Sequence, residues 1–168
     1  MKTIDFVRRH VERLERNGRF SLQKGFIQHG ICTVYDHSVQ VAVLSVSLTR
    51  CLRLPVHSNI LVRAALLHDY FLYDWHDKEA RPKGLHGYTH PDSALRNAQR
   101  DFDLSDIEKD IIRSHMWPLT LRRIPHCKEA WIVTLADKYC STLETLKLKR
   151  GAAQQYIENR RRNQSVQG

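Results

Sequence analysis

The sequence predicts an all-α protein with one domain, and three observations support this fold class. Only seven Gly and five Pro interrupt its 168 residues, which suits long helices better than many tight turns. Apolar residues make up 42% of the chain, enough for a packed core. Several segments repeat apolar residues at helical spacing, and none reads convincingly as a β-strand. We therefore expect one bundle of about six to seven helices over residues 1–168, with its core at about residues 30–145.

Capping residues and helix breakers place the helices of the first half. Thr3 can cap the first helix, which Asn17-Gly18 would end before a polar loop. Pro55 ends the second helix, and Ser58 is a good cap for the third. The third helix is apolar nearly all round, so we expect it to lie buried at the centre. In order, these helices are expected at about residues 4–17, 35–52 and 59–69.

The second half is expected to hold a long loop and three further helices. Residues 70–89 are rich in aromatic and charged side chains, and a loop of this length inside a compact domain is often functional. Pro91 suits a first helical position with His90 as the cap, and Ser105 forms a capping box with Glu108. The helices are expected at about residues 91–102, 106–115 and 128–149, followed by a basic tail. The last one is expected to contact the core through Trp131, Ile132, Leu135, Ala136, Tyr139 and Leu143.

The charge balance favours anionic partners. Lys and Arg number 27 against 18 Asp and Glu, which gives a net charge of +9 with neutral histidines. Such a balance suits nucleotides, polyphosphates or nucleic acid, without choosing among them. Much of the excess lies at the two ends, in Arg8, Arg9, Arg13, Arg16 and Arg19 and then in Lys147, Lys149, Arg150, Arg160, Arg161 and Arg162.

Cysteine usage and hydropathy bear on the compartment. The four cysteines form no C-x-x-C pair, which is typical of reduced thiols in a cytosol. No apolar run approaches the ~20 residues that span a bilayer, and the charged N-terminus lacks the apolar core of a signal peptide. We therefore expect a cytoplasmic protein without a membrane partner.

Four ionisable residues fall on the apolar faces of separate expected helices. His37 shares its stripe with Val41, His68 and Asp69 end the most apolar helix, and Asp137 lies among small and apolar residues. Each alone is more often a satisfied core residue than a ligand. Four of them on separate core helices predict a metal site, because a buried charge needs a partner and because imidazole and carboxylate bind divalent transition ions.

The order His37, His68-Asp69 and Asp137 resembles the HD superfamily of metal-dependent phosphohydrolases, which is named for its adjacent His-Asp pair. Residues 64–69, Ala-Ala-Leu-Leu-His-Asp, are similar to the signature A-x-L-L-H-D of the family. Leu135-Ala136-Asp137 resembles its closing x-A-D. The spaced set is a specific signal, whereas a lone His-Asp dipeptide is a weak one. The resemblance implies a single HD domain at about residues 30–145, with both basic ends outside it.

Two further histidines resemble the branch of the family with a dinuclear site. By this resemblance Asp69 bridges two ions, and it holds the second ion together with His90 and His115. His86 competes with His90 for that place, because Leu85-His86-Gly87 also resembles family sequence around this ligand. The resemblance implies one or two divalent ions, among Fe, Mn, Zn, Ni, Co and Mg. The ligands it implies for the first ion are His37, His68, Asp69 and Asp137.

The expected activity is hydrolysis of a phosphoester or phosphoanhydride, in a nucleotide or another small phosphorylated substrate. Asp69 is expected to orient the attacking water, and His86 to protonate the leaving oxygen. Many family members follow the pair with Gly and Lys, as in H-D-I-G-K, whereas Tyr70 follows it here. The lysine that contacts phosphate is therefore missing from its usual place. The candidates to replace it are Lys138, Lys83, Arg122 and Arg123.

Two other functions are compatible with the sequence. Some HD-fold members are di-iron oxygenases with the same pattern of ligands, and the basic surface favours phosphate chemistry over theirs. A domain without catalytic activity could use its basic ends to bind nucleic acid or an acidic partner, with the metal holding the helices together. The second pair of histidines speaks against that function, because a purely structural site does not require them.

Overall fold

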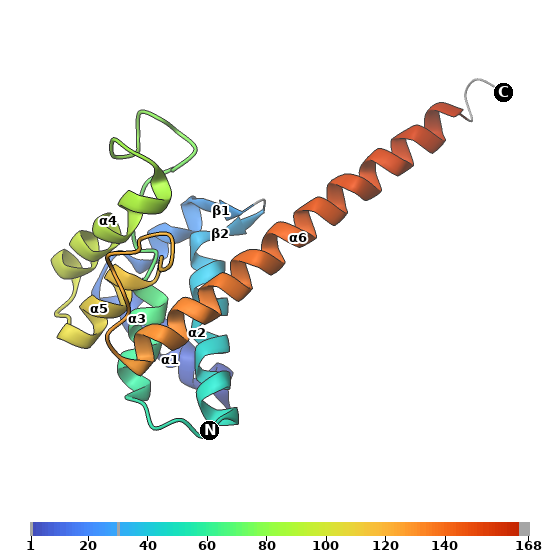
Figure 1. Cartoon of the computed structure of the whole chain (residues 1–168). Helices are drawn as coiled ribbons and strands as arrows, with labels where there is room; N and C mark the ends of the chain where they lie inside the picture. Colours follow the sequence, from blue (N-terminus) through green and yellow to red (C-terminus); the bar gives the residue numbers. More distant parts are fainter. Residues whose placement is uncertain (1, 30, 165–168) are drawn as a thin grey trace.

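The computed structural model describes residues 2–29 and 31–164, with side chains described for residues 2–28 and 31–146. The chain forms a helical bundle with one short hairpin at its edge, so the all-α class is confirmed (Figure 1). The elements are α1 (Thr3–Asn17), the 3-10 helix η1 (Phe20–Gly25), β1 (Ile27–His29), β2 (Cys32–Thr33), α2 (Val34–Cys51), α3 (Ser58–Leu67), α4 (His86–Asp101), α5 (Asp106–Ser114) and α6 (Lys128–Gln164).

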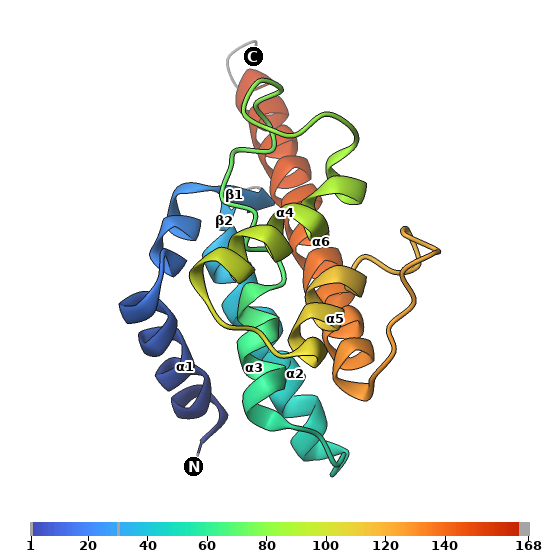
Figure 2. The same ribbon diagram turned by 90° about the vertical axis from the view of Figure 1, so that its left-hand side faces the viewer.

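The helices α2 and α3 form the centre of the bundle. They pack against each other, with α1 on one side and with α5 and α6 on the other (Figure 2). The prediction that the third helix is central is confirmed, because six of its ten residues have no exposed surface. Burying an aliphatic side chain of this kind stabilises the fold by about 1.5–3 kcal/mol. The six residues of α3 without exposed surface are Leu61, Val62, Ala64, Ala65, Leu66 and Leu67.

The first helix begins at its expected cap, one residue earlier than expected. Lys2 precedes α1 and Thr3 lies inside it, so the assignment of Thr3 as the cap was wrong. The hydroxyl of Thr3 instead accepts a hydrogen bond from the Arg50 guanidinium at 2.9 Å, which ties α1 to the end of α2. The end of α1 at Gly18 is confirmed. A Cβ atom on Gly18 would lie 2.4 Å from the ring of Phe102, so only glycine fits this close approach.

The loop after α1 holds the hairpin that the sequence did not reveal. Strands β1 and β2 pair antiparallel, with Ile27 opposite Thr33, and the expectation that the chain has no strand was wrong. Strands of three and two residues are too short to show an alternating pattern. Thr33 then caps α2 through a capping box with Asp36, so the hairpin leads directly into the helix that carries His37.

Helix α4 begins five residues before the expected start at Pro91. Its first residue is His86, so His90 lies inside the helix and is not a cap. Proline has no backbone N–H and leaves a carbonyl of the preceding turn without its usual donor. Here that carbonyl belongs to Gly87, four residues before Pro91. The carbonyl oxygen of His86, one residue earlier, lies 2.9 Å from the ring nitrogen Nδ1 of His90. The extra turn places both histidine side chains on one rigid element.

The capping box before α5 is confirmed, and its acid has a second role. Ser105 and Glu108 exchange the two capping hydrogen bonds. Glu108 is buried and also forms an ion pair with Arg63 of α3 at 3.1 Å. The pair joins α5 to the central helix.

Helix α6 is longer than expected and turns a different face to the core. It runs to Gln164, where about 149 was expected, and its second half extends beyond the bundle (Figure 1). The core contacts expected of Leu135, Tyr139 and Leu143 were wrong, because these side chains are exposed. The buried face carries Asp137 among residues such as Ala136. The basic side chains expected in the tail lie outside the described side chains.

Among the described residues, no helix combines the length and the hydropathy that crossing a bilayer requires.

Candidate metal centre

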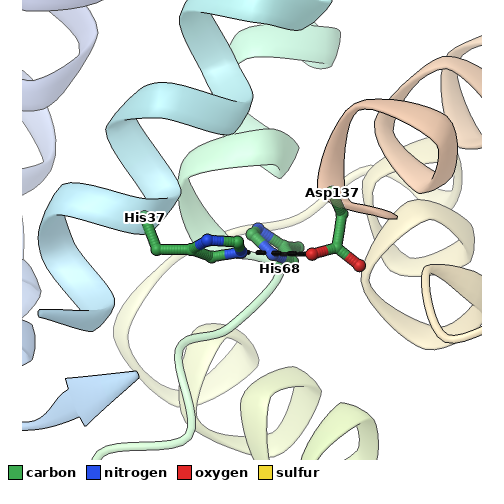
Figure 3. Close-up of side chains that lie close together, drawn as sticks. All are labelled: His37, His68 and Asp137. Atoms are coloured by element: carbon green, nitrogen blue, oxygen red, sulfur yellow. Dashed lines mark hydrogen bonds and ion pairs between the residues drawn. The ribbon is translucent and has the colours of Figure 1, made fainter. Parts of the chain in front are cut away.

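Three core helices bring the first group of candidate ligands together. His37 comes from α2, His68 follows the last residue of α3, and Asp137 comes from α6, with their side chains pointing toward one another (Figure 3). One nitrogen or oxygen atom of each lies within 4.8 Å of the others. The Nε2 atom of His37 is 3.1 Å from Oδ1 of Asp137, and that of His68 is 3.8 Å from the same oxygen. All three side chains are buried, so water does not compete for these atoms.

Asp69 lies between this group and a second one. Its Oδ2 atom is 3.4 Å from Nε2 of His68 and 3.8 Å from Nε2 of His37. Its Oδ1 atom is 3.1 Å from Nε2 of His90 and 3.4 Å from Nε2 of His115. Asp69 is 2% exposed. The two oxygens of one buried carboxylate thus face two separate sets of imidazoles.

All four imidazoles have the same orientation. In each, Nδ1 faces a hydrogen-bond acceptor and Nε2 points into the cluster. Such contacts fix the ring and its tautomer, with the hydrogen on Nδ1 and a lone pair on Nε2. The acceptors are the Glu144 carboxylate for His37 at 3.0 Å, the Ala65 carbonyl for His68 at 2.8 Å, the His86 carbonyl for His90 at 2.9 Å and the Ile112 carbonyl for His115 at 2.8 Å.

This buried donor set fits divalent transition ions. Nε2 of His68 and Oδ1 of Asp69 are buried without a hydrogen-bond partner among the described residues. The Nε2 atoms of His90 and His115 lie 2.8 Å apart, within hydrogen-bond distance of each other. A cation beside these atoms would satisfy all of them, and imidazole nitrogen with carboxylate oxygen is a typical donor set for such ions.

Electrostatics distinguishes His115 from the two imidazoles of the first group. Burial lowers the pKa of His115 to about 4, so its ring is neutral near pH 7. Burial also disfavours charge on His37, but hydrogen bonds to Asp137 and Glu144 outweigh it and raise its pKa to about 10. The same balance raises the pKa of His68, through Asp69 and Asp137. At the first group a proton and a metal ion therefore compete for the same lone pairs.

The carboxylates of the cluster stay ionised. Burial alone would raise the pKa of Asp69, but the neighbouring imidazoles of His68 and His90 hold it well below its usual range. The pKa of Asp137 is likewise held well below its usual range, through His37 and His68, against the effect of burial. Both groups therefore carry negative charge at neutral pH, as metal ligands must.

The comparison with protein families assigns the chain. The HD domain matches residues 34–142, which contain all six candidate ligands. The chain belongs to the HD domain family. The comparisons with curated proteins and with solved structures gave no significant match.

The histidine nearest the carboxylate of Asp69 in this HD domain is His90. His86, its competitor in the sequence, lies outside the two groups that converge on Asp69. Its ring stacks on Trp75, with centroids 4.9 Å apart, and its Nδ1 atom is 3.2 Å from the hydroxyl of Tyr73. Burial and the neighbouring His90 lower the pKa of His86 to about 3.

A cavity of about 280 Å³ leads to the cluster. Asp69, His90 and His115 line its inner end, and Trp75, His86 and Lys138 are among its other walls. The ammonium group of Lys138 donates to Oδ2 of Asp137 at 2.8 Å and to the carbonyl of His115 at 3.0 Å. The positively charged ammonium group of Lys138 thus lies beside the candidate metal ligands, in the wall of the cavity.

The other basic residues expected at the substrate are not brought to the cluster. Lys83 is exposed in the loop before α4 and is not part of the cavity wall. Arg122 and Arg123 line a different cavity, which shares no residue with the one at the cluster. His10 fits no ligand position in the sequence and was expected at the surface, which was wrong. It is buried, and its Nδ1 atom lies 3.0 Å from the carbonyl of Phe6.

Three supporting residues escaped the sequence analysis. Glu144 accepts from His37, and Ser141 donates to Oδ1 of Asp137 at 3.1 Å. Ser141 and Glu144 lie on the face of α6 that carries Asp137, four and seven residues after it, so helical spacing could have revealed them. Gln28 on β1 donates to Oδ2 of Asp69 at 2.7 Å. No sequence signal placed it there, because its strand was not recognised.

Proposed function

We propose that this HD domain is a metal-dependent phosphohydrolase, which cleaves a phosphoester or phosphoanhydride in a small substrate such as a nucleotide. The position of Asp69 carries the proposal, because it lines a cavity and its two oxygens face two separate groups of imidazoles. Membership of the HD family supports it. The cationic Lys138 beside the ligands supports phosphate as the group that is recognised.

In this proposal the chain holds two ions that share one carboxylate. When bound, divalent ions activate water for attack and offset the charge on phosphoryl oxygens. The imidazoles would bind through Nε2, where an ion would displace the protons that His37 and His68 otherwise hold, while Asp69 and Asp137 would supply the negative charge. The ligands proposed for the first ion are His37, His68, Asp69 and Asp137, and those for the second are Asp69, His90 and His115.

Lys138 is proposed to bind the phosphate of the substrate. Two of its three N–H groups are donated to Asp137 and to the carbonyl of His115. Its third contact is the sulfur of Met116 at 3.6 Å, a weak acceptor that a phosphate oxygen can replace. Lys138 would therefore take the role of the lysine that is missing after the His-Asp pair.

The aromatic wall of the cavity is proposed to hold the organic part of the substrate. Trp75 lines the cavity, and its indole N–H donates to the carbonyl of Ile27 at 3.1 Å, which fixes the ring. A nucleobase can stack on such a surface. Tyr88 and Trp117 are less suited than Trp75, because neither lines the cavity. Trp117 packs instead edge-on against Trp131.

The role of His86 is revised. It was expected to protonate the leaving oxygen, but a ring with a pKa of about 3 has no extra proton to give near pH 7. We propose that neutral His86 donates a hydrogen bond to the substrate and that solvent supplies the proton.

The test compares two substitutions of aspartate by alanine in the full chain. Asp69→Ala removes the shared carboxylate, whereas Asp103→Ala removes an exposed carboxylate at the distant start of α5. Metal content and phosphate release from nucleotides and sugar phosphates are measured for both variants and the unaltered protein. We expect Asp69→Ala to lose metal and activity, and Asp103→Ala to retain both. Unchanged hydrolysis in Asp69→Ala would refute the proposal.

The same protein also tests the oxygenase alternative, which uses a similar set of ligands. Iron-loaded protein is supplied with polyol and phosphonate substrates while dissolved oxygen is recorded. Oxygen uptake that depends on the substrate would replace the proposed reaction with oxidative cleavage, because hydrolysis consumes no oxygen. We expect no uptake, because Lys138 places a cation for phosphate beside the ligands.

A further inference from the structure

A second cavity, away from the candidate metal centre, carries three arginines, and Asp92 forms an ion pair with one of them, Arg123. Its volume is about 590 Å³, and it lies between α4, α5 and the segment that joins α5 to α6. Cavities of about 300–1,000 Å³ commonly hold small-molecule ligands. No residue of this cavity lines the one at the metal ligands.

The acids of this cavity are already engaged. Asp110 accepts from the backbone N–H of His126 at 2.9 Å, and its carboxylate also lies 2.9 Å from that ring. Asp106 forms an ion pair with Lys109 at 2.9 Å. The positive charge of the arginines on the same wall is therefore not neutralised by these two carboxylates.

Three guanidinium groups remain for a ligand. Arg113 and Arg122 are exposed, and neither forms a hydrogen bond or an ion pair with any residue of the described chain. Arg123 donates through Nη2 to Asp92 at 2.7 Å, while its Nη1 is buried without a partner in that part of the chain. A buried N–H without an acceptor is costly, so a bound anion would stabilise this arrangement.

We propose that this cavity is a second anion site, which binds the phosphate groups of a small phosphorylated ligand. Guanidinium groups bind phosphate through paired N–H donors, and three of them suit a ligand with more than one phosphate. The proposal does not depend on hydrolysis at the metal centre, because the two cavities share no side chain.

The test measures binding of inorganic triphosphate and of ATP by calorimetry, with the full chain treated with chelator. The variants are the double substitution Arg113→Gln with Arg122→Gln, the single substitution Arg123→Lys, and two controls. Arg123→Lys keeps a charge for Asp92 but removes the forked guanidinium. One control, Arg9→Gln, removes an exposed charge on α1, and the other, Lys83→Gln, removes one from the exposed loop before α4. Circular dichroism establishes that each variant is folded.

We expect the double variant and Arg123→Lys to bind at least about tenfold more weakly, with both controls near the unaltered protein. Binding of both probes would assign recognition to phosphate alone, whereas binding of ATP alone would add the nucleoside. The proposal is overturned if neither probe binds, or if Arg9→Gln or Lys83→Gln weakens binding as much as the double variant does.

Discussion

The Nε2 atoms of His90 and His115 lie 2.8 Å apart, although Nδ1 of each ring already faces a backbone carbonyl oxygen. At this distance the two Nε2 atoms are compatible either with a hydrogen on one of them or with a cation beside both. Oδ1 of Asp69, which is 3.1 Å from His90 and 3.4 Å from His115, would complete a ligand set at this point. The protein thus forms the second half of the cluster from rings that are held rigidly by their own helices.

We expect His90→Ala to lower the metal content from about two ions per chain to about one, because it removes one of the three ligands of the second ion. His86→Ala should leave the content unchanged, since His86 lies outside the ligand set. Inductively coupled plasma mass spectrometry of protein purified without chelators measures both. An exposed histidine in the loop before α4 provides the control His76→Ala. Loss of an ion in His86→Ala, with none in His90→Ala, would exchange the two assignments.

Glu144→Gln should weaken the binding of the first ion about 10- to 100-fold, because the carboxylate fixes the ring of His37 and raises its basicity. Competition with a chromogenic chelator measures this affinity. The matched control is Glu12→Gln on the exposed face of α1, for which we expect no change. An unaltered affinity in Glu144→Gln would mean that packing alone orients His37.

Lys138→Gln should lower kcat/KM for a phosphorylated substrate about 10- to 100-fold, as expected from the loss of a charged hydrogen bond to phosphate. The metal content should stay the same, because Lys138 is not a ligand. Lys83→Gln removes the same charge from the exposed loop and should leave kcat/KM near that of the unaltered protein. If Lys83→Gln were the more damaging change, the phosphate contact would belong to the loop.

The chelated protein should lose stability as the pH falls from about 6.5 toward 4. Burial holds the pKa of His115 at about 4 and that of His86 at about 3, below the ordinary value of 6.5. The unfolded chain therefore takes up more protons than the folded chain in this range, which favours unfolding. His37 does not counter the trend, since its raised pKa stabilises the fold fully below 6.5.

Thermal unfolding of chelated protein between about pH 7 and pH 4.5 measures the effect. The variant His86→Gln should show a smaller fall in Tm than the unaltered protein, because one of the two groups no longer titrates. A Tm that is constant over this range would contradict the assignment of neutral buried rings.

Gly18→Ala should destabilise the protein by about 1–3 kcal/mol, because the new Cβ atom would lie 2.4 Å from the ring of Phe102. The chain offers a matched control in Gly25→Ala, since a Cβ atom there would meet no atom within 4 Å. Urea denaturation gives the free energy of unfolding for both variants. Equal stability of the two would show that Phe102 moves aside without cost.

The sequence by itself determined the helical class and the central position of α3, and it predicted the candidate ligands, with His86 and His90 as competitors for one place. These follow from local rules, because helical phase decides which side chains point inward and because the His-Asp pair with its spaced partners is specific. The capping box of Ser105 and Glu108 could be predicted from the sequence for the same reason, since capping depends on residues three positions apart.

Only the tertiary structure decided which groups surround the ligands. Gln28 donates to Asp69, which is 41 residues away in the sequence. Arg123 and Lys138 are both basic, yet they line different cavities. The face of α6 that is buried was also decided by packing, because the helix carries apolar residues such as Leu135 on its exposed side as well. Contacts between distant segments depend on how whole helices pack, and local spacing carries no record of that arrangement.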